Sequence, residues 1–97
     1  MEVGRGLVPT FLVALQRTSV LYGPRPWWDP GARRAAARAA DFLACFSEGS
    51  RFFTNTDGFP HRIDGQRFGL TDSLFDAGLV ALGARYAGMW WHVEDEP

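Results

Sequence analysis

The sequence predicts an α+β fold: two N-terminal helices packed on a small C-terminal antiparallel sheet of three or four strands, in two layers. Three observations lead to this prediction. The segment after Pro30 has apolar residues at helical spacing, the segment after Gly49 changes to strand and turn patterns, and the end of the chain has a hairpin pattern. With 97 residues, 46% of them apolar, the chain can bury one core as a single domain over residues 1–97. Its expected parts are a helical part over 7–48, a β-meander over 51–94 and an acidic tail over 94–97.

The first helix is predicted over residues 10–21. Pro9 is tolerated at a helix start, and Gly23-Pro24 is a strong stop signal. The β-branched residues of this segment leave a strand as the alternative. The apolar run 7–15 is too short to span a membrane, and its flanks do not fit a signal peptide, so we expect a buried segment and no membrane contact.

The second helix is predicted after Asp29 as its N-cap, with Pro30 at the first helical position and Gly49 near its end. Small residues near the start of its apolar face and bulky ones near the end predict a close helix approach followed by an aromatic anchor in the core. The residues of that face are Ala32, Ala35, Ala36, Ala39, Phe42, Leu43 and Phe46.

Strands and turns are predicted after Gly49. A strand over residues 51–56 leads to a turn at 57–58, and a second turn at 64–65 precedes a short stretch at 66–70. Two further strands, over 77–82 and 86–93, flank Gly83-Ala84-Arg85 as a hairpin.

A loop of even length in this hairpin would place Leu82 opposite Ala87, Val80 opposite Met89 and Leu79 opposite Trp90. One face then holds Val80, Leu82, Met89 and Trp91, and the other holds Leu79, Trp90 and His92. Only one face can pack on the helices, so the other exposes a tryptophan. A loop of odd length would instead shift this register and exchange the faces of one strand. The sequence leaves open the register and therefore which tryptophan is exposed.

Charge and cysteine content narrow the function classes. The ten basic residues are all Arg and the net charge is −1, without the basic stripe that duplex nucleic-acid binding requires. Cys45 is the only cysteine, which excludes an intramolecular disulfide and a multi-Cys metal site. A free thiol fits a reducing compartment, so we expect a cytoplasmic protein with no metal and no cofactor.

Tryptophan occurs as two pairs, Trp27-Trp28 in a proline-rich loop and Trp90-Trp91 in the last strand. Exposed aromatic residues and Arg dominate the binding energy of protein interfaces. The sequence therefore predicts an interface in which an outward Trp90 stands beside neighbouring polar and aromatic residues. The candidate interface residues are Trp90, His92, Tyr86, Arg85, Leu79, Trp27 and Trp28.

These features favour a small bacterial or phage-type protein that binds another protein, as inhibitors, immunity proteins and antitoxins do, with no catalysis of its own. One alternative is a small enzyme or nuclease that uses His92, Glu94 and an Arg. Another is a single-strand nucleic-acid binder that uses Trp27, Trp28 and the arginines of the second helix, Arg33 and Arg34. A homodimer that pairs its last strand edge to edge is also predicted as a possible state.

Overall fold

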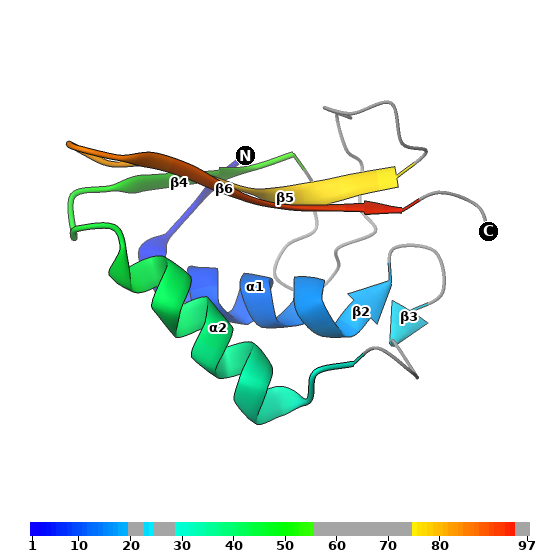
Figure 1. Cartoon of the computed structure of the whole chain (residues 1–97). Coiled ribbons are helices and arrows are strands. Elements are labelled where there is room, and N and C mark those ends of the chain that lie inside the picture. Colours follow the sequence, from blue (N-terminus) through cyan, green and yellow to red (C-terminus); the bar gives the residue numbers. More distant parts are fainter. Residues whose placement is uncertain (20–22, 25–28, 56–74, 95–97) are drawn as a thin grey trace.

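The computed structural model describes residues 1–19, 23–24, 29–55 and 75–94. They form two layers, a four-stranded sheet above and two helices below (Figure 1). The elements in chain order are β1 (Glu2–Val3), a 3₁₀ turn η1 (Arg5–Leu7), α1 (Val8–Arg17), β2 (Thr18–Ser19), β3 (Gly23–Pro24), α2 (Ala32–Ala44), β4 (Arg51–Thr54), β5 (Phe75–Leu82) and β6 (Ala87–Glu94). The predicted α+β architecture is therefore confirmed.

The main sheet has the strand order β1-β4-β5-β6, and every neighbouring pair is antiparallel. Its first strand comes from the N-terminus, so the sheet is not built from the C-terminal part alone as predicted. The strand predicted over 51–56 is confirmed as β4, which ends at Thr54. The turns predicted at 57–58 and 64–65 and the stretch at 66–70 lie outside the described residues.

Helix α1 spans Val8–Arg17, earlier than the predicted 10–21. Its buried side chains recur at helical spacing and include Val8, Phe11, Leu12 and Leu15, each at most 1% exposed. After Arg17 the chain enters β2, which pairs with β3 as a short antiparallel ribbon. The predicted helix continuation was wrong at positions 18 and 19, where the backbone is extended, a conformation that the β-branched Thr18 favours. Positions 20 and 21 of the predicted helix lie outside the described residues.

Helix α2 begins at Ala32, and Gly31 precedes it as the N-cap with a φ of 88°. A positive φ is strained for residues other than glycine, so Gly31 sets the helix start, and the prediction of Asp29 as N-cap was wrong. Asp29 instead accepts the Gly31 N–H at 2.8 Å and pairs with Arg17 at 3.0 Å. The Arg17 hydrogen bond, followed by that from Gly31, lowers the pKa of Asp29.

The buried face of α2 is narrower than predicted. Ala35 and Ala39 are fully buried against α1, whereas Ala32 and Ala36 are exposed. The small methyl groups bring the two helix backbones close together. Within this contact the buried Gln16 side chain donates from Nε2 to the Ala35 carbonyl at 2.8 Å, which ties α1 to α2.

The end of α2 is held by an arginine from the other end of the chain. Arg5 donates to the Leu43 carbonyl oxygen in the last turn of α2 at 3.4 Å, and to the carbonyl oxygens of Phe46 at 2.7 Å and Ser47 at 2.8 Å just after the helix. Helix ends leave carbonyl groups without intrahelical partners, and a guanidinium can serve several of them at once. The Arg5 guanidinium also lies 5.9 Å from the centre of the Phe52 ring. It therefore links η1, the end of α2 and β4.

The hairpin of β5 and β6 has the register expected for a loop of even length. Leu82 pairs with Ala87, Val80 with Met89 and Leu79 with Trp90. The connecting loop contains four residues, 83–86, and Gly83 donates to the Tyr86 carbonyl at 2.8 Å. The even loop length that the prediction required is thus confirmed, with β6 starting one residue later than expected.

Candidate protein-binding surface

The sheet has one side on the helices and one side turned away from them (Figure 1). We call the apolar residues of the second side the outer face: Phe53, Val80, Leu82, Met89 and Trp91. The register places Phe53, Val80 and Met89 in one row across β4, β5 and β6. Leu82 and Met89 are 49% and 58% exposed, so this row continues into accessible apolar surface.

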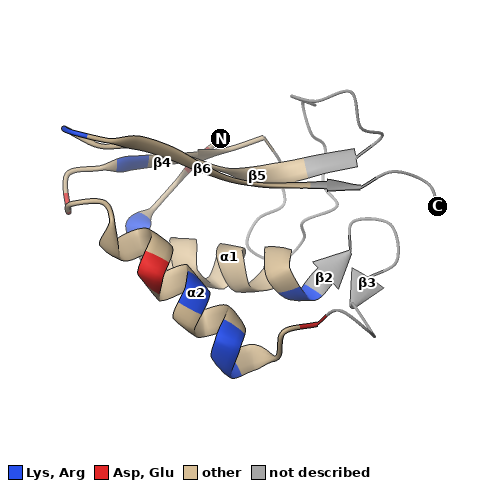
Figure 2. Cartoon of the chain, viewed as in Figure 1, with Lys and Arg blue, Asp and Glu red and all other residues tan. Residues whose placement is uncertain are grey.

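The charged side chains described beside the outer face lie on β1 and β4. The side chains described in β5 and β6 carry no charge (Figure 2). On the β1–β4 side, the Arg51 guanidinium donates twice to the Glu2 carboxylate, at 2.7 and 3.0 Å, and lies 5.1 Å from the Phe53 ring centre. The hydrogen bond from Arg51 lowers the pKa of Glu2. Among the described side chains, the outer face is therefore an apolar strip with the Glu2–Arg51 ion pair at its β1–β4 side.

Trp91 lies across the strand pair from Gly78. A Cβ built on Gly78 would overlap the Trp91 ring and the Trp90 carbonyl oxygen, so the ring occupies the space that the glycine leaves. An aromatic side chain over a cross-strand glycine is a known way of stabilising such a pair. The Trp91 indole N–H is buried and has no hydrogen-bond partner among the described residues.

Trp90 points to the helices, which corrects the expectation of an outward Trp90. Its ring meets the Phe42 ring edge-on, with centres 5.6 Å apart. Its indole N–H donates to Nε2 of His92 at 2.9 Å, and the two rings are stacked 6.4 Å apart. An imidazole nitrogen accepts only when unprotonated, so this contact requires the neutral His92 tautomer with its proton on Nδ1.

Small residues decide which side of the hairpin meets the helices. A Cβ built on Gly88 would lie 2.8 Å from Cζ of Phe46, so that ring rests directly on the β6 backbone. Ala77 and Ala81 on β5 are fully buried on the same side. Leu79 lies between them and is fully buried, so the structure places it in the core and not on an exposed interface.

The other predicted interface residues have different positions. Tyr86 is 65% exposed, and Arg85 is exposed in the hairpin turn. Trp27 and Trp28 lie outside the described residues. Leu82 and Met89 were not singled out from the sequence, although the predicted register already placed them on one side. Small residues lie on both sides of the hairpin, with Ala81 and Gly88 towards the helices and Gly78 on the outer side, so they gave no signal that could have selected the outer face.

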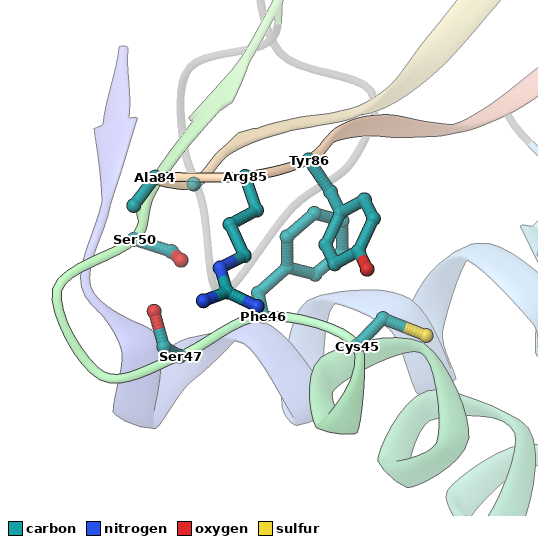
Figure 3. A pocket seen from close by; sticks show the side chains of 8 residues that line it. Cys45, Phe46, Ser47, Ser50, Ala84, Arg85 and Tyr86 are labelled. Atoms are coloured by element: carbon teal, nitrogen blue, oxygen red, sulfur yellow. The ribbon is translucent and has the colours of Figure 1, made fainter.

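A hollow of about 190 Å³ lies between the hairpin turn and the end of α2. Figure 3 shows Arg85 and Tyr86 reaching from the turn towards Ser47 and Cys45. The Ser50 hydroxyl borders the hollow, is buried and has no hydrogen-bond partner in the described part of the chain. The full lining is Cys45, Phe46, Ser47, Ser50, Gly83, Ala84, Arg85 and Tyr86.

This lining contains no imidazole and no carboxylate, so the hollow holds hydroxyl groups, a thiol and a guanidinium without a general base. Cys45 is exposed, and its thiol contacts the Asp41 carbonyl at 3.5 Å. Within the ranges 1–19, 29–55 and 75–94, no cluster of three or more His, Cys, Asp or Glu side chains could hold a metal ion. The helices that the structure describes are too short and too polar to cross a membrane.

Searches against protein-family models, curated proteins and solved structures return no match to this chain. The geometry of the described residues is therefore the basis for any assignment of function.

Proposed function

We propose that this protein works by binding another protein through its outer face, in the manner of an inhibitor, immunity protein or antitoxin, with no catalysis of its own. One observation carries the proposal. Phe53, Val80 and Met89 form a row across the outer face, and Met89 and the neighbouring Leu82 are about half exposed. Contiguous exposed apolar surface costs free energy in water, and in soluble domains it is typical of interaction sites.

The composition of the outer face supports this role. Met and aromatic residues are enriched at protein interfaces, and charged residues are depleted from the centre of such surfaces. Met89 can adapt its unbranched side chain to a partner, while Phe53 and Trp91 offer rigid area. The exposed Cys45 thiol favours action in a reducing compartment, and we include a cytoplasmic location in the proposal.

The test compares two substitutions at leucines of similar exposure. Leu82 on the outer face is 49% exposed and Leu7 in η1 is 45% exposed. Wild type, Leu82→Asp and Leu7→Asp are immobilised as full chains and used to capture proteins from a lysate of the source cells. Captured proteins are then purified and their binding is measured directly by calorimetry. Far-UV circular dichroism verifies that each variant is folded.

The proposal expects one protein to bind wild type and Leu7→Asp with similar affinity and Leu82→Asp at least about tenfold more weakly, the effect of placing a charge in a desolvated contact. Equal affinity for all three chains would refute the outer face as the binding surface. Absence of any specific partner for folded wild type would refute the binding function itself.

A further inference from the structure

Among the described strands, β6 forms one edge of the main sheet. It is last in the strand order, eight residues long and free of proline, and its first seven residues carry no formal charge. The opposite edge is β1, which contains two residues. Natural proteins protect long edge strands with charge, proline or bulges, because an unprotected edge pairs with another strand. None of these protections is present along Ala87–Val93.

The hydrogen-bonding pattern identifies the free backbone groups of this edge. Gly83 donates across the hairpin to Tyr86, whereas the Gly78 N–H points the other way and donates to the Asn55 side chain at 3.3 Å. Alternation along an antiparallel pair then directs Gly88 and Trp90 towards β5. The residues whose N–H and C=O groups point away from the sheet are Ala87, Met89, Trp91 and Val93.

This edge is complementary to itself. When two copies of a strand pair about a two-fold axis, residues directly opposite each other keep their side chains on the same face. Centring the axis on Trp90 places Met89 opposite Trp91 of the second copy and Ala87 opposite its Val93. The exposed thioether of Met89 would then contact an indole ring, a favourable cross-strand pair.

Charge at the two ends of β6 favours the same orientation. Arg85 precedes the strand and Glu94 is its last residue. Antiparallel pairing places the start of β6 in one copy beside the end of β6 in the other. Arg85 of each copy then lies near Glu94 of the other copy, so the same pair of opposite charges occurs at both ends of the seam. A parallel pairing would place like charges side by side. Arg85 is exposed and makes no ion pair with the described residues.

We propose that two copies of this chain associate through β6, antiparallel and centred on Trp90, to form one continuous eight-stranded sheet. The seam would contain about eight backbone hydrogen bonds, two for each of four opposed pairs of outward residues. The two outer faces would join into one apolar surface, because Met89 and Trp91 lie at the seam. This inference is independent of the proposed function, since the dimer needs no other protein.

The experiment is sedimentation equilibrium of the purified full chain from about 1 µM to about 1 mM, the range in which small interfaces dissociate. Wild type is expected to shift from monomer to dimer. Met89→Pro removes an outward N–H that makes no bond to β5, and it is expected to stay monomeric. Leu82→Asp, one strand away from the seam, is expected to dimerise like wild type, although it is expected to lose the partner of the proposed function.

A charge exchange tests the orientation without disturbing the strand backbone. Arg85→Glu and Glu94→Arg should each raise the dimer dissociation constant about tenfold at low salt, and the double variant should return it to within about threefold of wild type. A wild type that remains monomeric throughout would overturn the inference. So would a folded Met89→Pro that dimerises normally, or a double variant as weak as the single ones.

Discussion

Gly78→Ala tests the packing of the β5–β6 pair most directly. A Cβ at this position would lie 2.7 Å from Cδ2 of Trp91 and would overlap the Trp90 carbonyl oxygen. Cε3 of the same ring lies closer still, and carbon atoms in good contact are separated by about 3.5–4.0 Å, so a shift of more than about 1 Å is needed. Rotation of the Trp91 ring cannot provide it alone, because the second obstacle is backbone. The two strands must therefore separate.

The expected cost follows from these contacts. Overpacking a well-packed site costs about 1–3 kcal/mol, and the involvement of backbone places Gly78→Ala near the upper end. The lower entropy of the unfolded chain with Ala offsets about 0.4–1 kcal/mol. A net loss of about 2 kcal/mol corresponds to a melting temperature lower by about 8–16 °C for a domain of this size.

The assay is thermal unfolding followed by circular dichroism, with Gly49→Ala as the matched control. A Cβ at Gly49 would meet nothing within 4 Å, and its φ is not positive, so the control should melt within about 3 °C of wild type. If Gly78→Ala melts like Gly49→Ala, the close contact between Trp91 and the β5 backbone does not exist. Trp91 would then not be held on the outer face by Gly78.

Three further predictions concern the helices and the surface charges. Arg5→Gln should lower the free energy of unfolding by about 1–3 kcal/mol in urea titration, because carbonyl groups at the end of α2 lose a charged donor. The control Arg33→Gln, on the exposed side of α2, should change this free energy by less than about 0.5 kcal/mol. Ala39→Leu should cost about 1–3 kcal/mol by overpacking the contact with α1, and equal stability of Ala39→Leu and the exposed Ala36→Leu would contradict that contact. The pKa of Asp29 is lowered in the folded chain, so the ionised carboxylate stabilises the fold above the ordinary carboxyl pKa near 4 and loses this effect as the pH falls through the lowered value. Asp29→Asn should therefore be less stable than wild type at pH 7, and a series of urea titrations at decreasing pH should show the difference shrink.

The hairpin shows what the local sequence pattern can predict and what it cannot. Turn residues at 83–85 and the alternation around them predicted the hairpin, with Val80 opposite Met89 and Leu79 opposite Trp90 if the loop is even and a shifted strand if it is odd. The structure shows the even case. The same pattern does not distinguish the two sides of the sheet. Both sides carry a tryptophan and aliphatic residues, so local sequence could not select the one that meets the helices.

The ends of the helices illustrate a second limit. The apolar spacing placed both helices in the right part of the chain, but α2 starts two residues after Pro30 because Gly31 adopts a positive φ. Its C-terminal carbonyls are served by Arg5, about forty residues away in sequence. No spacing rule connects such residues, since the contact exists only once β1 has paired with β4.

By itself, the sequence determined the fold class, the existence of both helices and the strand at Arg51, because each depends on interactions between residues close in the chain. The hairpin register was fixed only by the length of the loop in the structure. Only the tertiary structure decided that Phe46 rests on Gly88, that Trp90 and Leu79 therefore point inwards, and that Leu82 and Met89 remain exposed on the outer face. The physical reason is that the orientation of a two-sided sheet is set by the volume of whatever packs on it, and here that volume comes from helix side chains distant in the sequence.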